Sequence, residues 1–386
     1  FWGLVISVFT SIVSYAATDI MEIVPNGLVW EETLREGDIW KGQRFAWVTE
    51  GEILRIPKPG FKVAGRTPGE IIMDLNNEKP AKIVVSFYNR GDERSIREEE
   101  FINRIREVKT ELDKTMGRSK AYKPPDTWTS MKIEGFYWDG KNSGILLEWD
   151  ADRRGPEFLR MTVVPAKELS EIMVDHKKTV NRTTKGKSAI KKNVVRQKDG
   201  DIFIKDIPMI DQGSKGYCAA AATARLVRYY GHEKVDQHEI ARMSGTTASG
   251  GTNPTVMIRG IYKILPAKFG LRVKPDLYEA TFRGINEQYN ELAKKMKKPH
   301  VALTVRPYIN KNGIVIGMPT YEMWTKNDKD ILRQAISGNK MNMDKWVKQL
   351  VSHIDQGIPV LWGMMLGVHP EEMITPQKIG GHMRII

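Results

Sequence analysis

The sequence contains one cysteine, Cys218, among its 386 residues. A chain with one cysteine forms no intramolecular disulfide, so its stability depends on its packed core. No group of cysteines and histidines has the spacing of a metal site, and we expect no metal and no cofactor. Hydrophobic residues make up 41% of the chain and charged residues 28%, which is typical of a globular protein and not of a disordered one. The length is sufficient for two or three domains.

Acidic residues are absent from residues 177–198, where nine lysines and arginines are found. This segment supplies most of the net charge of +13, so the basic isoelectric point describes one stretch and not the whole fold. No aromatic side chains that could stack on bases are interspersed with the basic ones, which argues against nucleic-acid binding. We interpret residues 176–200 as a solvated basic linker, with weak contact to anionic envelope polymers as the alternative.

Charge is also lacking at the N-terminus, where residues 1–17 are almost wholly apolar. The run is shorter than the roughly 20 residues of a membrane-spanning helix. Ser14 and Ala16 place small residues where a signal peptidase cleaves. We therefore interpret residues 1–17 as a signal-peptide remnant, with an N-terminal anchor as the alternative, and expect a secreted, periplasmic or envelope location.

Residues 18–175 predict a small α+β domain. Short runs of β-branched and aromatic residues recur between Gly, Pro, Asn and Asp clusters, a pattern that indicates strands. A helix is indicated where Ser95 and Glu98 form a capping box, and Gly117 is expected to end it. This unit would be an accessory domain or a pro-domain.

Residues 201–386 predict a second unit, with helices first and strands last. A helix is expected over 219–230, and a second is expected to be capped by Asp236. A further helix is indicated over 344–356, followed by strand-like runs over 358–365 and 381–386. The chain has no internal repeat.

Cys218 lies at the predicted start of the first of these helices. The exposed N–H groups and the dipole at a helix N-terminus stabilise an anion, which favours the nucleophilic thiolate. Glycines precede the cysteine, so a substrate could approach the backbone closely. Gln212, six residues upstream, could present its side-chain amide beside the sulfur.

Residues 211–219, Asp-Gln-Gly-Ser-Lys-Gly-Tyr-Cys-Ala, resemble the active-site segment of papain-like cysteine peptidases. The Ala-rich helix, the Gln237-His238-Glu239-Ile240-Ala241 helix and Gly380-Gly381-His382 before a strand resemble the bacterial branch that includes the bacteriocin-processing (double-glycine) peptidases. The resemblance covers about 205–386. It implies a papain-like domain with a helical half and an antiparallel sheet half. Lys215 and Ala219 depart from classical papain, which has cysteine and tryptophan there.

The resemblance also implies the role of each site residue. Cys218 attacks the carbonyl carbon, and His382 removes the thiol proton and later protonates the leaving amine. Gln212 and the backbone N–H of Cys218 bind the oxyanion. Gly216, Gly250 and Gly251 would bind the substrate backbone, although Gly250 and Gly251 could equally form a flexible loop.

His382 is chosen from seven histidines because it alone follows two glycines and lies in an apolar, strand-like run. His369 in a polar loop is the rival base, and a structural strand histidine is the other alternative. An Asn or Asp that orients the histidine is absent after His382, because the sequence ends four residues later. We expect that this residue lies beyond 386 and that the 201–386 domain is truncated.

The sequence thus predicts an exported cysteine peptidase, a monomer that acts on a peptide or protein substrate. Two alternatives remain open. The same residues could transfer an acyl group to an amine, as transglutaminase-like enzymes do, or the chain could be an inactive, peptidase-like binding protein of the envelope.

Overall fold

The computed structural model describes residues 19–34, 37, 40–93, 95–124, 131–152, 155–175, 184–213, 216–233, 235–247, 251–252, 254–271, 279–299, 305–309, 315–319, 325–338, 340–368 and 380–386. The chain divides into two compact units. Unit 1 comprises Phe1–Asn89, Ser95–Thr127 and Met131–Lys177, and unit 2 comprises Arg90–Arg94, Trp128–Ser130 and Lys178–Ile386. The predicted signal-peptide remnant lies outside the described residues.

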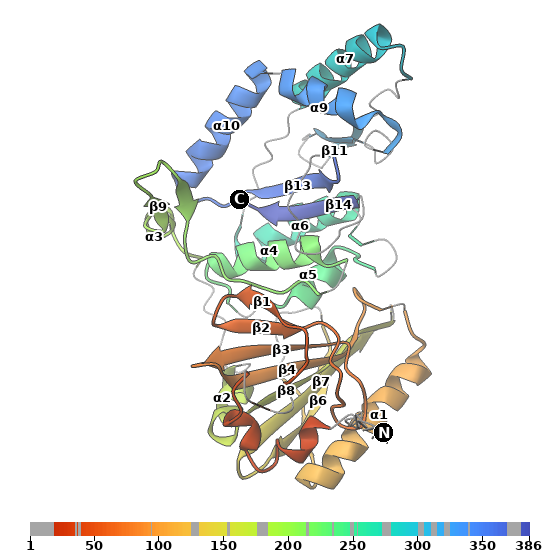
Figure 1. Ribbon diagram of the computed structural model, residues 1–386, viewed down its shortest axis with the longest axis vertical. Coiled ribbons are helices and arrows are strands. Elements are labelled where there is room, and N and C mark those ends of the chain that lie inside the picture. Colours follow the sequence, from red (N-terminus) through yellow and green to blue (C-terminus); the bar gives the residue numbers. More distant parts are fainter. Residues whose placement is uncertain are drawn as a thin grey trace, which may run out of the picture. The chain divides into compact units, whose positions relative to one another are not determined.

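Unit 1 is built on an antiparallel sheet (Figure 1) with the strand order β1-β2-β3-β4-β8-β7-β6-β5. Its described strands are β1 (Ala46–Thr49), β2 (Ile53–Ile56), β3 (Glu70–Asn76), β4 (Lys79–Asn89), β5 (Lys120–Tyr122), β6 (Ile133–Asp139), β7 (Ser143–Asp152) and β8 (Gly155–Pro165). Strands that follow each other in the chain are paired, except that β4 pairs with β8 and not with β5. Together with the helices of this unit, the sheet confirms the predicted α+β class.

The long helix of unit 1, α1 (Glu98–Met116), ends at Gly117 as predicted. Gly117 has φ 84°, a backbone conformation that glycine adopts without strain. The predicted capping box is wrong, because the helix begins after Arg97, whose side chain makes no cap hydrogen bond. Three consecutive glutamates, Glu98–Glu100, occupy the first turn instead, and their charges interact favourably with the helix dipole.

Both faces of the unit 1 sheet are covered. Ile145 and Leu147 of β7 lie in the main core, to which α1 contributes Phe101, Val108 and Leu112. The 3-10 helices η1 (Ile20–Glu22) and η2 (Leu28–Trp30) add apolar residues to the same core.

The helix α2 (Ala166–Asp175) covers the opposite face of the sheet. Side chains alternate along a strand, so Gly144 of β7 faces the other side from Ile145. There, a Cβ on Gly144 would lie 2.5 Å from Cβ of Leu169 in α2, which shows how closely α2 packs.

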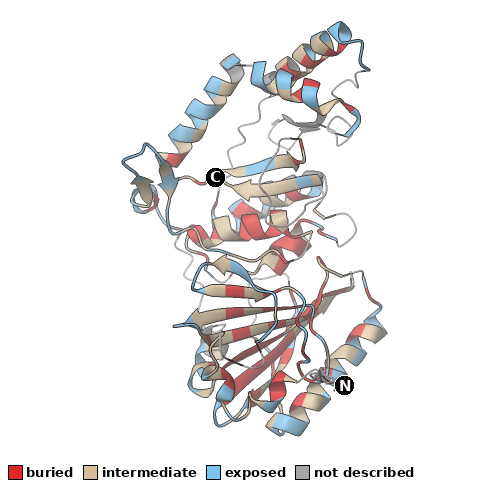
Figure 2. Cartoon of the chain, in the orientation of Figure 1, coloured by how far each residue is buried: buried red, intermediate tan, exposed pale blue. Residues whose placement is uncertain are grey.

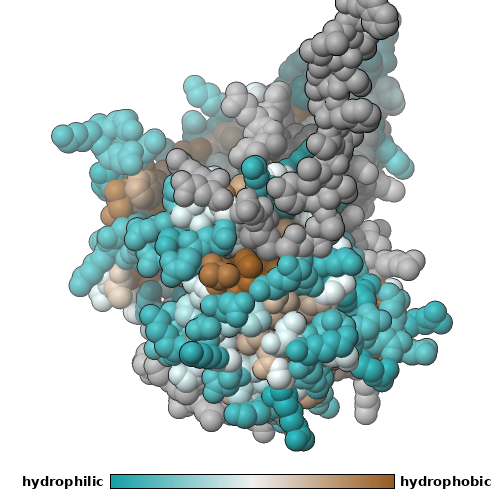
Figure 3. Space-filling model, turned by 60° about the horizontal axis from the view of Figure 1, so that its bottom comes forward, coloured by the Kyte–Doolittle hydropathy of each residue, from teal (hydrophilic) through white to brown (hydrophobic). Residues whose placement is uncertain are grey.

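The burial of residues follows this arrangement (Figure 2), with buried side chains along the central strands. On the face of the molecule in Figure 3, hydrophilic side chains predominate around a small hydrophobic patch. Trp47, in the edge strand β1, is 50% exposed. Single exposed apolar side chains of this kind are normal on a folded surface and define no site.

We expect Leu147→Ala to lower the free energy of unfolding of unit 1 by about 2–5 kcal/mol, since a fully buried side chain is lost and a cavity remains. Leu28→Ala is the matched control, because Leu28 is 52% exposed and its loss should cost less than about 0.5 kcal/mol. Urea denaturation, followed by hydrogen exchange of peptides from β6 to β8, measures both. Equal effects of the two substitutions would contradict the assignment of Leu147 to the core.

Unit 2 combines helices with two-stranded antiparallel sheets. Its described helices are α3 (Lys187–Lys191), α4 (Cys218–Tyr229), α5 (Gln237–Met243), α6 (Pro254–Phe269), α7 (Glu279–Lys295), α9 (Lys329–Gly338) and α10 (Lys340–Ile354). The sheets pair β9 (Val194–Arg196) with β10 (Ile202–Ile204), β11 (Val305–Ile309) with β12 (Val315–Pro319), and β13 (Leu361–Leu366) with β14 (Gly380–Ile385). None of the helices in the described ranges is long and apolar enough to cross a membrane.

Part of the segment predicted as a linker carries regular structure. Residues 184–200 contain α3 and β9, and Ile190 of α3 is buried. The Tyr229 hydroxyl oxygen lies 3.3 Å from the carbonyl oxygen of Ile190, which places this segment against α4. Residues 184–200 of the basic stretch are therefore partly structured, with one buried apolar side chain and one strand of a hairpin.

Candidate active site

Cys218 is the first residue of α4, as predicted, and it is partly exposed. The residues that follow it, Ala219 to Ala222, are all buried. Tyr217 occupies the N-cap position, and its side chain makes no cap hydrogen bond. The sulfur is therefore attached at the start of a buried helix whose first N–H groups are not capped by the side chain of Tyr217.

Two faces of α4 have different neighbours. Ala220, Ala224 and Val227 recur at helical spacing and belong to the core that α4 shares with α5 and α6. Helical geometry places Cys218 on the opposite face, with Ala221 and Ala222 one turn further along. Ala221 and Ala222 are buried but do not belong to that core. Small side chains on this face allow close approach of another element.

Strand β14, which carries His382, packs against α4 and lies beside it in Figure 1. At one end of the pair, the Tyr229 hydroxyl donates a hydrogen bond of 3.0 Å to the carbonyl oxygen of Gly357. Gly357 is three residues before Val360, and the backbones of Val360 and Ile386 exchange hydrogen bonds of 3.0 and 2.9 Å. The C-terminal ends of α4 and β14 are thus at the same end, and the two elements run parallel.

Parallel packing brings the beginnings of both elements to the other end. From Tyr229 back to Cys218 the helix extends about 16 Å, at about 1.5 Å per residue. From Ile386 back to His382 the strand extends about 13 Å, at about 3.3 Å per residue. Cys218 and His382 therefore lie at comparable distances from the shared end, although 164 positions separate them in the sequence.

His382 is partly buried on β14 and is paired with Met364 of β13. Alternation along the strand places its side chain on the opposite face from Gly381, whose partner is Met365. Met365 packs against the apolar cluster of α7 and α9. His382 thus belongs to the other face of this hairpin.

The rival histidines have other surroundings. His232 is buried with Nε2 3.1 Å from the carbonyl oxygen of Phe269, and burial lowers the pKa of its imidazole. His238 is buried in α5 with Nδ1 3.1 Å from the Tyr217 hydroxyl. His353 lies on α10. The rival base His369 lies outside the described residues, as do His176 and His300.

The loop before Cys218 contains two glycines in left-handed conformations, Gly213 with φ 80° and Gly216 with φ 85°. Residues with a side chain rarely adopt this backbone conformation, which accounts for glycine at both positions. The backbone N–H of Gly213 donates a hydrogen bond of 3.1 Å to Oδ1 of Asp211, which closes a turn around Gln212. Gln212 is partly buried and lies at this turn, as the sequence placed it, six residues before the thiol.

Gly216 and Gly251 come together in the structure. A Cβ on Gly251 would lie 3.9 Å from Cα of Gly216. Gly251 and Thr247 exchange backbone hydrogen bonds of 2.9 and 2.8 Å, and the Thr252 hydroxyl lies 3.4 Å from the carbonyl oxygen of Gly216. Gly216, two residues before Cys218, and Gly251 thus lie close together, whereas Gly250 lies outside the described residues.

Tyr217 is a residue of this site that the sequence did not single out. It is fully buried between Gly216 and Cys218, and its hydroxyl contacts His238. The available signal was a large aromatic residue within a segment of glycines and alanines. In the sequence, His238 belongs to the Gln237–Ala241 segment of the family resemblance, and no local pattern connects it with Tyr217.

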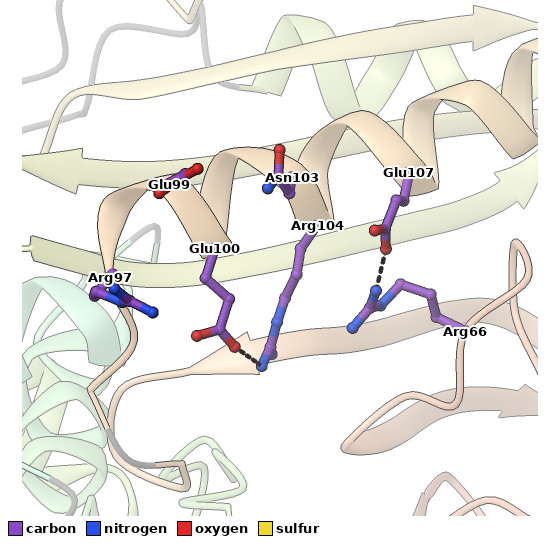
Figure 4. A pocket seen from close by; sticks show the side chains of 7 residues that line it. All are labelled: Arg66, Arg97, Glu99, Glu100, Asn103, Arg104 and Glu107. Carbon is purple, nitrogen blue, oxygen red and sulfur yellow. Dashed lines mark hydrogen bonds and ion pairs between the residues drawn. The ribbon is translucent and has the colours of Figure 1, made fainter.

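Unit 1 contains a polar pocket (Figure 4), which is lined by Arg66, Arg97, Glu99, Glu100, Asn103, Arg104 and Glu107. Arg66 pairs with Glu107, and Arg104 pairs with Glu100 at 3.1 Å. Opposite charges therefore compensate each other within the pocket, and it contains no nucleophilic side chain. Among the described residues, no three of the His, Cys, Asp and Glu side chains are grouped as a metal site requires.

Comparisons with protein-family models, with curated proteins and with solved structures found no match to this chain. The support for the candidate site comes from its geometry alone. It consists of a thiol at the start of a buried helix, a histidine on the strand that runs parallel to that helix, and a glycine loop that precedes the thiol.

Proposed function

We propose that unit 2 is a papain-like cysteine peptidase that hydrolyses peptide bonds. The observation that carries the proposal is the parallel packing of α4 and β14, which brings the beginnings of the helix with Cys218 and the strand with His382 to the same end. A thiol at a helix N-terminus next to an imidazole is the arrangement that activates a cysteine nucleophile.

In the proposed reaction, His382 holds the proton of the Cys218 thiol, and the thiolate attacks the carbonyl carbon of the peptide bond. The C–S bond forms, and the carbonyl electron pair moves to oxygen. This oxyanion collapses, the C–N bond breaks, and the His382 imidazolium gives its proton to the leaving amine. Water, deprotonated by His382, then attacks the thioester, which releases the carboxylic acid and restores the thiol–imidazole pair.

The oxyanion needs hydrogen-bond donors, and the chain offers two at the right place in the sequence. One is the backbone N–H of Cys218 at the start of α4, and the other is the side-chain amide of Gln212. Donors that are already in position stabilise the developing charge without reorganisation. Gly216 and Gly251, which lie next to each other, would accommodate the extended backbone of the substrate.

We expect Gln212→Ala to lower kcat by about 10²–10³-fold with little change in KM, because this donor acts mainly on the transition state. Gln356→Ala is the matched control, since this exposed glutamine hydrogen-bonds to Ser352 at the end of α10. Steady-state hydrolysis of a fluorogenic peptide measures both parameters. A Gln212→Ala enzyme with wild-type kcat would exclude Gln212 from the oxyanion hole.

Product analysis tests the function as a whole. The chain is incubated with a peptide mixture, with and without a primary amine, and new termini and adducts are identified by mass spectrometry. Free carboxyl termini support hydrolysis, whereas amine adducts at carbonyl groups would show acyl transfer, the second candidate reaction. If a folded chain yields neither product, both hydrolysis and acyl transfer are contradicted. That outcome would favour an inactive binding protein.

Unit 1 would act as an accessory domain or a pro-domain, and the chain would be an exported monomer that acts on a peptide or protein. The proposal of export depends on the apolar residues 1–17.

A further inference from the structure

Tyr217 immediately precedes the nucleophile and is fully buried at the N-cap of α4. The peptide bond between Tyr217 and Cys218 carries the N–H that the proposed function uses as an oxyanion donor. A peptide unit is planar, so the direction of that N–H is fixed by the position of the Tyr217 backbone. Whatever holds Tyr217 therefore also orients the donor.

His238 holds the hydroxyl end of Tyr217. The Tyr217 hydroxyl lies 3.1 Å from Nδ1 of His238, and the two rings meet edge to face at 5.2 Å. His238 is itself fixed at the first turn of α5, where its backbone N–H donates a hydrogen bond of 2.8 Å to the Asp236 carboxylate. The hydrogen bond between Tyr217 and His238 is buried. Buried polar pairs favour one arrangement, because a buried polar group that is left without a partner costs more free energy than an exposed one.

Gly91 contacts the ring of Tyr217 as well. Gly91 follows β4 in the chain but belongs to unit 2, and it is buried. A Cβ at this position would lie 2.2 Å from two ring carbons of Tyr217, a distance at which atoms clash. The carbonyl oxygen of Gly91 also lies 2.8 Å from where a Cβ of Gly216 would be. The Tyr217 ring is therefore held by His238 through its hydroxyl and by the backbone of Gly91 against its carbons.

We propose that Tyr217 and His238 are positioning residues that aim the backbone N–H of Cys218 at the oxyanion. This inference rests on the proposed peptidase function. Tyr217 neither touches the substrate nor moves a proton in this account. Its buried hydrogen bond with His238 fixes the peptide unit, and a small displacement of an oxyanion donor weakens transition-state stabilisation.

Tyr217→Phe tests the inference because it keeps the ring and removes only the hydroxyl. We expect kcat to fall about tenfold while KM is unchanged, since the oxyanion forms only after the substrate has bound. Binding of a peptide aldehyde, which forms an oxyanion-like adduct with the thiol, should weaken by a similar factor. Alkylation of Cys218 by iodoacetamide generates no oxyanion, so its rate and pH profile should match the wild type.

Tyr289→Phe provides the matched control. Tyr289 is also a fully buried tyrosine of unit 2, and its hydroxyl accepts a hydrogen bond of 2.9 Å from the backbone N–H of Asp328. It lies on α7, in the core that α7 shares with α9 and not in the core of α4. The two substitutions remove the same atom from a buried ring, so a general loss of stability would affect both variants alike. We expect Tyr289→Phe to leave kcat and aldehyde affinity unchanged.

His238 supplies a second pair of variants. His238→Asn keeps a polar atom near the position of Nδ1 and should retain most of the activity, whereas His238→Leu should reproduce the effect of Tyr217→Phe. Wild-type kcat in Tyr217→Phe, or an equal loss in Tyr289→Phe, would overturn the inference while leaving an active wild type as support for the peptidase. Slower alkylation in Tyr217→Phe would also overturn it, because the hydroxyl would then act on the thiol. A wild type that cleaves nothing would overturn the function and this inference together.

Discussion

Replacing Cys218 with alanine should reduce peptide hydrolysis by at least about 10⁴-fold, because removing the nucleophile of a covalent mechanism leaves only the binding and oxyanion contributions. The chain has one cysteine, so no second thiol can substitute for it. Initial rates with a fluorogenic peptide measure the loss. Residual activity within tenfold of the wild type would show that hydrolysis does not use this thiol.

The structure indicates that this variant will fold. Cys218 is partly exposed, and the next four residues of α4 are alanines, so a further alanine suits the helix. Circular dichroism and the urea midpoint should match those of the wild type. Cys218→Ser adds a second comparison, since it keeps a hydrogen-bonding side chain of similar size while replacing a good nucleophile with a poor one.

Replacing His382 with alanine should lower kcat by about 10²–10⁴-fold, the range typical of a lost general acid–base group. The imidazole is assigned both proton transfers, so acylation and deacylation should both slow. Initial rates of hydrolysis, together with a burst-phase assay of the acyl-enzyme, distinguish the two steps.

His353→Ala is the control for this substitution. His353 lies on α10 in the same unit and has no assigned role in catalysis. Its replacement should change the rate less than about twofold, within the scatter expected of a remote substitution. If both histidine variants lose activity equally, the loss follows from unfolding of unit 2, and His382 is not the base.

The elements around Cys218 could be predicted from local sequence signals. The start of α4 at Cys218 follows from the glycines before it and the alanines after it, and the Asp236 cap of α5 is confirmed by its hydrogen bond to His238. Boundaries were less accurate where local signals are weak. The helix expected over 344–356 extends over Lys340–Ile354, and the strand expected over 358–365 extends over Leu361–Leu366.

Arrangements that depend on distant residues could not be predicted. The pairing of β4 with β8 joins strands separated by a long helix and three further strands, and no local pattern specifies it. The parallel packing of α4 and β14 likewise depends on tertiary contacts across most of unit 2. The contact between Tyr217 and His238 belongs to the same class, since two residues 21 positions apart meet only when α5 folds back against α4.

The most direct test of the account is the rate at which iodoacetamide alkylates Cys218 between pH 4 and 9, in the wild type and in His382→Ala. Intact mass reports the reaction at a single site, because the chain has one cysteine. An activated pair predicts fast alkylation already near about pH 6 in the wild type, and loss of this reactivity in His382→Ala. Alkylation that rises only near about pH 8.5, and equally in both proteins, would show an ordinary thiol and contradict the proposed site.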